Sequence, residues 1–318
     1  MADVADEGVN PDAFDRLSVA MPAVALTAAL ESNHIVYFRH CPVPLPDEPT
    51  LHYLRSELPS RLRLKNVTYY PEAERLSGLS ADAATRNRVR MVLREHLAAV
   101  SSFVCARFPH LSLSAGKCSF RPIQERGRNL RPHASNELVH IDAGAYGATH
   151  GDRILRVFVN VNAYEDRVWA SKGDFHALLQ RHGEAAGLLD GRGTLKPRIH
   201  ENAADRVYSA LIRSLARSGE LARLVDSSPY DRIMRRLHNY MKDDDGFKHD
   251  LTEYEEIRFP PGSAWMTFTD SVSHASLSGQ FALVTTIIVR RSSLLYPQFS
   301  PFDALAAHAA SRSTPSSG

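Results

Sequence analysis

The chain has 318 residues, of which 43% are hydrophobic and 23% are charged. This is the composition of an ordinary globular protein, and it excludes the disordered, collagenous and coiled-coil classes. Lys and Arg number 38 against 36 Asp and Glu, which leaves a formal net charge of only +2. So small a charge provides no overall field to hold DNA or RNA, and we expect no nucleic acid among the partners.

The ends of the sequence and its apolar stretches bear on where the protein works. Residues 1–10 are small and acidic, without the basic-then-apolar order of a secretory signal. The longest apolar stretch, residues 20–30, is about half of the ~20 residues that a membrane span requires. The three cysteines are too few and too widely spaced for a disulfide framework. These features favour a cytoplasmic protein.

Helical periodicity and short apolar runs predict the first elements. Residues 22–32 are predicted to form a helix and residues 34–38 a strand. Ser80 is a suitable N-cap for a longer helix, in which apolar residues recur at helical spacing as far as Phe108.

After residue 110 the pattern changes to short β-type runs separated by Gly, Pro and Asn, with a helical stretch between them. The predicted strands are 111–114, 118–123, 138–142, 153–162, 255–259, 263–269 and 281–289, and the predicted helices are 175–180, 202–224 and 230–241. Such an order is typical of an α+β protein with a mainly antiparallel core.

Short strands in this number favour a jelly-roll, or cupin-like, barrel. We predict a jelly-roll core at about 111–170 and 253–292, with N-terminal supporting helices and a helical insertion at about 173–241. Because there is neither an internal repeat nor a low-complexity linker, the whole is predicted to be a single domain. That domain covers residues 11–306, and residues 1–10 and 307–318 are predicted to be flexible tails.

Two His-x-Asp pairs occur in the sequence. Alternate residues of a strand face the same side, so a His and an Asp two apart can both bind one metal ion. His140 and Asp142 end the predicted strand 138–142, where an inward-facing pair would be costly without a bound partner. His150 and Asp152 lie in a Gly-rich segment and are predicted to be solvated. The first pair is therefore the candidate for metal binding.

A third ligand is needed, and the best candidate is His274. It lies between the strand that ends near Thr269 and the strand that begins at Phe281. Two His and one carboxylate on one side of a metal leave three positions open, which is the facial triad of non-haem Fe(II) oxygenases. A bidentate 2-oxo acid and dioxygen would fill these positions. The alternative for His274 is a loop histidine that is hydrogen-bonded to a neighbouring Ser.

A 2-oxoglutarate co-substrate requires a cation for its far carboxylate, preferably an Arg. Arg156 and Asn160 share one face of the predicted strand 153–162, which makes both of them candidates for binding the co-substrate. Arg290, near the end of the last strand, is the second cationic candidate. The alternative for Arg156 is an ion pair with a structural carboxylate.

Further cations and an aromatic residue cluster near these strands. Arg121, Arg131 and Arg167, with Trp169, are predicted to form a basic, aromatic-walled entrance. Because Arg binds carboxylate or phosphate in a bidentate manner and Trp packs against a sugar face, such an entrance suits an anionic, sugar-like substrate. For each of these Arg residues a solvated surface charge is the alternative.

Taken together, these segments resemble the Fe(II)/2-oxoglutarate-dependent hydroxylases of 3-deoxy-D-manno-oct-2-ulosonic acid (Kdo). The similarity covers roughly residues 119–291, and the long run from Arg131 to Trp169 is far more specific than His-x-Asp alone. The matching segments are Ser119-Phe-Arg-Pro, Arg131-Pro-x-x-Ser-x-x-Leu-Val-His-Ile-Asp-Ala143, Arg153-Ile-Leu-Arg-Val-Phe-Val-Asn-Val-Asn162, Arg167-Val-Trp169 and Ser273-His-Ala-x-x-Ser-Gly-Gln280.

The resemblance implies a double-stranded β-helix fold, Fe(II) on His140, Asp142 and His274, and 2-oxoglutarate as co-substrate. It also implies that the substrate pocket is lined by Arg121, Arg156, Arg167 and Trp169, so Arg156 has two candidate roles. Many related oxygenases carry an Arg or Lys about ten residues after the distal His. Here that stretch is Val284-Thr-Thr286, so the carboxylate must be bound from another position.

The implied reaction is hydroxylation at C3 of Kdo in the lipopolysaccharide inner core, with Kdo-lipid A as substrate. It consumes O2 and 2-oxoglutarate and gives the 3-hydroxy sugar acid (Ko), succinate and CO2. The substrate would be lipid-linked, so we expect peripheral association with the inner-membrane surface. Three alternatives remain open: an oxygenase acting on a protein or small acid, a non-catalytic sugar-binding barrel, and a zinc hydrolase. The oligomeric state, homo-oligomer included, is also open.

Overall fold

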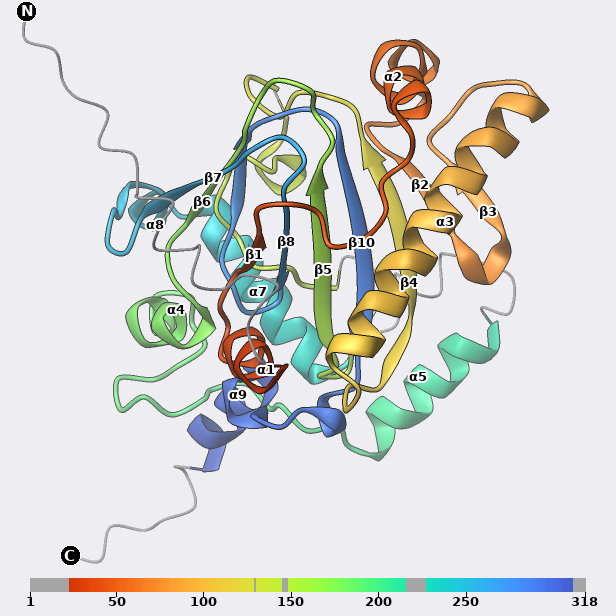
Figure 1. Ribbon diagram of the computed structural model, residues 1–318. Helices are drawn as coiled ribbons and strands as arrows, with labels where there is room; N and C mark the ends of the chain where they lie inside the picture. The colour runs from red at the N-terminus through yellow and green to blue at the C-terminus, as the bar shows by residue number, and fades with distance from the viewer. Residues whose placement is uncertain (1–22, 129, 145–147, 216–226, 311–318) are drawn as a thin grey trace, which may run out of the picture.

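The computed structural model describes residues 23–310, apart from residues 129, 145–147 and 216–226. Its strands form two antiparallel sheets (Figure 1). The seven-stranded sheet has the order β1 (Val36–Phe38), β8 (Ala264–Phe268), β5 (Arg153–Asn160), β10 (Ala282–Val289), β4 (Leu113–Arg121), β2 (Val67–Tyr70), β3 (Arg75–Ser77). The three-stranded sheet has the order β7 (Glu255–Phe259), β6 (Arg167–Ser171), β9 (Ala275–Ser278).

Helices cover both sheets. In Figure 1, α3 crosses in front of β4 and β10, and α7 passes behind the strands. The helices are α1 (Ala23–Glu31), α2 (Glu48–Ser56), α3 (Ala83–Arg107), α4 (Phe175–His182), α5 (Ala203–Leu215), α7 (Pro229–Asp243), α8 (Asp245–His249) and α9 (Pro301–Ala310). No helix in the described part of the chain is long and apolar enough to cross a bilayer.

The central strand β5 separates two environments, because its side chains alternate between two faces. Leu155, Val157 and Val159 belong to the large apolar cluster that the N-terminal helices complete. Phe158 points the other way, and its ring centroid lies 4.7 Å from that of Trp169 on β6. Arg156 shares the face of Phe158, so it lies in the space between the two sheets.

Helix α3 is the longest helix among the described residues, and its apolar spacing explains how it packs. Five residues at intervals of three or four are buried against the seven-stranded sheet, namely Val89, Leu93, Leu97, Val100 and Val104. The helix is capped by Asp82, whose Oδ1 accepts a hydrogen bond of 2.8 Å from the Thr85 amide. The predicted cap, Ser80, is therefore two residues too early.

Most predicted elements are confirmed, with informative differences. The runs 111–114 and 118–123 form one strand, β4, because both pair with β10 across a bulge. Residues 138–142 form no continuous strand and pair only at one bridge, His140 with His274. Helix α9 continues to Ala310, and His308 Nδ1 lies 2.7 Å from the Gly193 carbonyl, so no flexible tail begins at residue 307.

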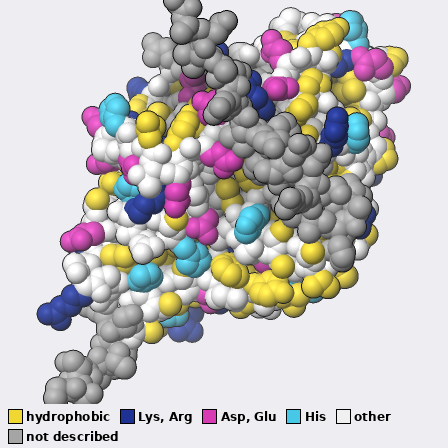
Figure 2. Space-filling view, turned by 60° about the vertical axis from the view of Figure 1, so that its left-hand side comes forward, with side chains coloured by type: hydrophobic (Ala, Val, Ile, Leu, Met, Phe, Trp, Pro, Cys, Tyr) yellow, Lys and Arg dark blue, Asp and Glu magenta, His cyan; other side chains and the backbone are white. Residues whose placement is uncertain are grey.

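Other predictions fall partly or wholly outside the described residues. Helix α5 confirms the start of the predicted helix 202–224, whose end lies in the undescribed segment, as does the tail at 1–10. The sequence patterns also missed several described elements, namely α2, β2, β3, β6, α8, β9 and α9. On the face shown in Figure 2, Lys and Arg side chains are interspersed with Asp and Glu, as the small net charge suggests.

Candidate metal centre

Two segments far apart in the sequence meet beside the three-stranded sheet. His140 and His274 exchange backbone hydrogen bonds of 3.0 and 2.8 Å, and the Asp142 amide donates to the Thr269 carbonyl at 2.7 Å. These bonds fix the His-Ile-Asp segment alongside the start of β9. As a result, His140, Asp142 and His274 offer ligand atoms that all lie within 4.8 Å of one another, and all three residues are buried. Among the described residues this is the one such group of metal-binding side chains.

The backbone also orients both imidazole rings. His140 Nδ1 lies 2.7 Å from the Leu138 carbonyl, and His274 Nδ1 lies 3.0 Å from the Val272 carbonyl. A carbonyl only accepts, so each Nδ1 carries the proton and each Nε2 keeps its lone pair. This is the arrangement that metal-binding histidines adopt in proteins.

Burial and charge set the protonation of the three residues. Burial lowers the pKa of His274 to about 4, and burial with the nearby His274 lowers the pKa of His140 well below its usual value. Burial would raise the pKa of Asp142, but the Arg156 guanidinium and the two histidines hold it well below its usual range. Two neutral imidazoles and one carboxylate therefore face one another, which is the protonation state that binds a divalent cation.

The donor set fits Fe(II). Asp142 Oδ2 is buried without a hydrogen bond, although Arg156 Nη2 lies 2.9 Å away as an ion-pair partner. Arg156 balances the charge of this oxygen, but a buried oxygen that accepts no hydrogen bond is costly, and a bound metal ion would use its lone pair. Two imidazole nitrogens and one carboxylate oxygen are the ligands of the facial triad of non-haem iron.

The other predicted site residues divide into two groups, and the first lies between the sheets. Arg156 pairs with Asp142, which is one of the three clustered residues and not a structural carboxylate elsewhere. Trp169 is 2% exposed and stacks on His274, with ring centroids 5.1 Å apart and planes at 25°. The Arg121 guanidinium lies 5.9 Å from the centroid of Phe158, on the same side of the sheet as Arg156.

Arg167 reaches the same space but is held by its neighbours. Its Nη2 lies 3.3 Å from Glu125 Oε1 and donates to Ser276 Oγ at 2.9 Å, and it is 1% exposed. Glu125 is itself buried and accepts from the Asn136 amide at 3.1 Å. Sequence reasoning missed Glu125, because a lone Glu in a loop gives no signal of burial.

The second group lies away from the cluster and corrects two predictions. The Asn160 side-chain Nδ2 donates to the backbone carbonyls of Glu165 and Phe259, and its Oδ1 accepts from the backbone amide of Asn162. The polar atoms of this side chain therefore hold the turn after β5. The Arg290 side chain is 60% exposed and pairs with Asp152 at 2.8 Å. Neither residue is placed to bind a co-substrate beside the cluster.

The second His-x-Asp pair is also held by other contacts. His150 Nδ1 lies 2.7 Å from Glu201, while Asp152 pairs with Arg290. The two residues therefore bind separate partners and form no metal site with each other. The prediction of a solvated loop is only partly met, because the Asp152 side chain is 18% exposed.

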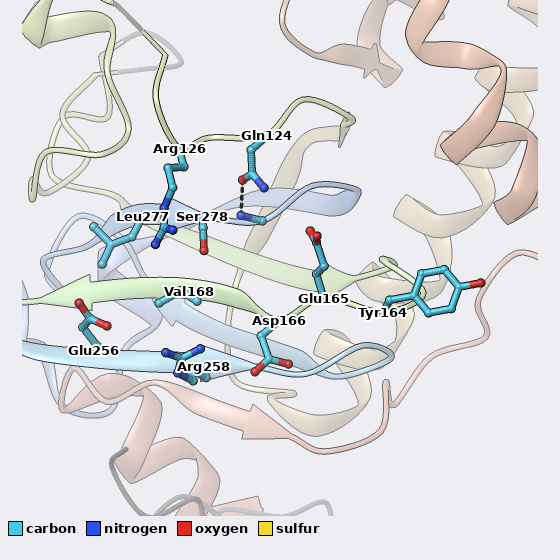
Figure 3. A pocket seen from close by; sticks show the side chains of 11 residues that line it. Gln124, Arg126, Tyr164, Glu165, Asp166, Val168, Glu256, Arg258, Leu277 and Ser278 are labelled. Carbon is cyan, nitrogen blue, oxygen red and sulfur yellow. Dashed lines mark hydrogen bonds between the residues drawn. The ribbon is translucent and has the colours of Figure 1, made fainter. Parts of the chain in front are cut away.

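A surface hollow of about 560 Å³ lies over the three-stranded sheet (Figure 3). Val168 lines it, whereas the flanking residues Arg167 and Trp169 face the space between the sheets, so the hollow is on the outer surface. It contains none of the three clustered residues. Its lining is Gln124, Arg126, Tyr164, Glu165, Asp166, Val168, Glu256, Arg258, Leu277, Ser278 and Gly279.

A buried His-Asp-His cluster beside two antiparallel sheets defines a class of protein, the non-haem Fe(II) oxygenases. Comparison with known proteins identifies the family within that class. Residues 15–312 match the family described as 3-deoxy-D-manno-oct-2-ulosonic acid (Kdo) hydroxylase. The match covers most of the chain, so the chain belongs to this family. No curated protein matches it.

Two similar solved structures are described as the Kdo hydroxylase KdoO, a non-haem Fe(II) α-ketoglutarate-dependent dioxygenase. The apo structure has 26% sequence identity and a TM-score of 0.73. The complex with α-ketoglutarate and Fe(III) has 25% identity and a TM-score of 0.71, and in both cases the match covers 90% of this chain and 89% of the other. The prediction of an Fe(II)- and 2-oxoglutarate-dependent Kdo hydroxylase is thus confirmed.

Proposed function

We propose that this enzyme hydroxylates C3 of Kdo in Kdo-lipid A and gives Ko, succinate and CO2. The observation that carries the proposal is the buried cluster of His140, Asp142 and His274 in the protonation state that binds a divalent cation. In this proposal the two Nε2 atoms and the Asp142 carboxylate hold Fe(II). Bound there, Fe(II) would supply the oxidative chemistry that couples decarboxylation of 2-oxoglutarate to hydroxylation.

The pairing of the strands supports a double-stranded β-helix within a single domain, whose described part ends with α9 at Ala310. One side of the proposed barrel is β4, β10, β5 and β8, which are neighbours in the seven-stranded sheet. The other side is the three-stranded sheet, which the bridge between His140 and His274 extends by the ligand segment. The other strands and helices of the seven-stranded layer lie outside this barrel.

The charge between the sheets suits anionic ligands. Arg121 and Arg156 share the inner face of the seven-stranded sheet, and both 2-oxoglutarate and Kdo carry carboxylates. We propose that these two arginines bind them, with Arg156 nearer to the metal because it contacts Asp142. Trp169 keeps the His274 ring in place by stacking on it, and the site is thereby closed to water on that side.

Arg167 has a different role in this proposal. Because Glu125 and Ser276 already hold its guanidinium, we propose that Arg167 shapes the pocket and contributes charge to it. The pairing with Glu125 keeps that charge fixed in a buried position. Arg167 thus remains part of the substrate site without being its first contact.

The lipid part of the substrate bears on location. Arg63, Leu64 and Lys65 are exposed and consecutive, and one residue, Asn66, separates them from β2. Cationic and apolar side chains together suit the surface of a membrane with anionic lipids. We propose that the enzyme works at the cytoplasmic face of the inner membrane, in peripheral contact with it.

The test is an assay of the full chain with Fe(II), 2-oxoglutarate, O2 and Kdo-lipid A. We expect the lipid to gain the mass of one oxygen atom and succinate to form in equal amount. His140→Ala should lower turnover by at least about a hundredfold, since even residues around metal ligands contribute 10–100-fold. His150→Ala is the matched control and should remain active. Succinate release without oxygen transfer to Kdo-lipid A would overturn the proposed substrate.

A further inference from the structure

We propose that the insertion helix α7 holds the metal-binding segment, residues 140–142, in place, and that His238 on this helix is a positioning residue for His140. The inference rests on the proposed metal role of the cluster. It concerns residues that are neither ligands nor pocket arginines, and it follows from the contacts of one helix with the chain before, within and after the His-Ile-Asp segment.

The central contact is with the segment itself. His238 Nδ1 lies 2.6 Å from the Ile141 carbonyl, between the two ligands His140 and Asp142. The His238 ring also packs edge-to-face on the His140 ring, with centroids 5.2 Å apart and planes at 81°. One side chain therefore constrains both the backbone between the ligands and the ring of the first ligand.

The C-terminal end of α7 holds the chain before the segment. Lys242 is 2% exposed, and its Nζ donates to the carbonyls of Ser135 at 2.8 Å and of His133 at 3.4 Å. It lies four residues after His238, so both side chains are on one face of the helix. The next residue, Asp243, contacts His133 Nε2 at 2.8 Å.

The N-terminal end holds the chain after the segment. Asp231 accepts hydrogen bonds from the backbone amides of Thr149 at 2.7 Å and His150 at 3.3 Å. Its other role is to complete a capping box with Ser228, which fixes the first turn of α7. The helix thus contacts the chain on both sides of the ligands as well as between them.

The burial of Lys242 indicates that these contacts are specific. A buried ammonium is costly unless hydrogen bonds and charge compensate it. Burial lowers the pKa of Lys242 to about 8, and the charge of Asp142 acts in the opposite direction, so the ammonium lies within electrostatic reach of the metal-binding carboxylate. A helix that served only to cover the sheet would not require a polar residue there.

Because these contacts hold the ligand segment, the metal site is formed before a metal ion binds. Groups that orient metal ligands typically contribute 10–100-fold to metal affinity. Loss of the bond from His238 to Ile141 would free the backbone between the two ligands and the ring of His140. We expect weaker metal binding with little change in the fold, because the apolar residues of α7 stay in place.

The experiment compares His238→Gln with His238→Asn in the full chain. The Asn amide nitrogen reproduces the position of Nδ1, whereas the Gln amide nitrogen reproduces that of Nε2, so only Asn keeps the bond to Ile141. Co(II) affinity is measured anaerobically by its visible absorption, together with the melting temperature of the metal-free protein. We expect His238→Gln to bind Co(II) about 10–100-fold more weakly. His238→Asn should stay within about threefold of the unmodified chain.

His308 provides a matched control, because its Nδ1 lies 2.7 Å from a backbone carbonyl that is remote from the cluster, that of Gly193. His308→Gln should leave Co(II) affinity unchanged. The inference is overturned if His238→Gln binds Co(II) as the unmodified chain does, or if the Gln and Asn variants are equally weak. If the unmodified chain and His140→Ala bind Co(II) alike, the proposed metal site fails instead.

Discussion

The two long helices α3 and α7 support the sheets in different ways. Helix α3 contacts the seven-stranded sheet through a continuous apolar stripe that includes Val89, Leu93 and Val100. Helix α7 also buries an apolar stripe, but His238 and Lys242 of the same helix form hydrogen bonds to the metal-binding segment and to the loop before it. Helix α3 is joined to the fold mainly by packing, and its hydrogen bonds from Arg86 end on the carbonyls of Leu76 and Leu79, outside the metal-binding segment. Helix α7 is also joined to the site.

This difference separates stability from metal binding. Apolar packing is non-directional, so its loss lowers the free energy of unfolding without specifying where a ligand atom lies. Hydrogen bonds are directional, and those of α7 end on the backbone beside the ligands. Substitutions in α3 should therefore change stability, whereas polar substitutions in α7 should change metal affinity.

Leu93→Ala is the strongest test of the α3 half of this comparison. Leu93 is fully buried in the apolar cluster, so truncation leaves a cavity and should lower the free energy of unfolding by about 2–5 kcal/mol. Urea denaturation measures this change. Co(II) affinity of the folded variant should stay within about threefold of the unmodified chain, and a larger loss would contradict the separation.

Periodicity predicts the helices and strands that carry such apolar stripes. The five buried apolar positions of α3 and the alternation of β5 are visible in the sequence, because packing repeats every three to four residues in a helix and every two in a strand. The ligand segment has no such regularity. Residues 138–142 are held by one bridge to His274 and by the Thr269 carbonyl, both more than a hundred residues away. Their short apolar run therefore predicted a strand where the structure has only a bridge.

The site is predictable to the extent that its chemistry is local. His140 and Asp142 form a short motif, and His274 follows from the need for a third ligand. Long-range partners are less accessible: His238 meets Ile141 across 97 positions, and no spacing rule connects them. The apolar face of α7 gave no signal either, because His238 and Lys242 lie beside this face and not within it. Asn160 was misassigned because alternation gives the face of a side chain but not its partner.

Glu125→Gln sharpens the comparison within the site. Glu125 balances Arg167 in a buried position, so neutralising it should lower the free energy of unfolding by about 1–3 kcal/mol. The KM for Kdo-lipid A should change, since the proposed pocket gains uncompensated positive charge. Co(II) affinity should change less than KM, because the bond from His238 to the ligand segment does not involve Glu125. Arg290→Ala, at the exposed pair with Asp152, is the control with no expected effect on either constant.

The smallest expected change in stability comes from His96, the one polar residue among the buried residues of α3. His96 is 3% exposed, neither ring nitrogen has a hydrogen-bond partner, and burial lowers its pKa to about 4. The unfolded chain takes up a proton below a pH of about 6.5, whereas the folded chain does so only near pH 4, so stability falls as the pH drops through this interval.

His96→Leu removes both the unpaired nitrogens and this proton uptake. We expect a gain of about 1 kcal/mol at pH 7, because an unsatisfied buried polar group is replaced by an apolar one. Between pH 6.5 and 4, the slope of the unfolding free energy against pH should also decrease, by the equivalent of up to one bound proton. Urea denaturation at several pH values measures both changes. An unchanged slope of the unfolding free energy against pH would contradict the lowered pKa of His96. A change in Co(II) affinity would contradict the separation between α3 and the metal site.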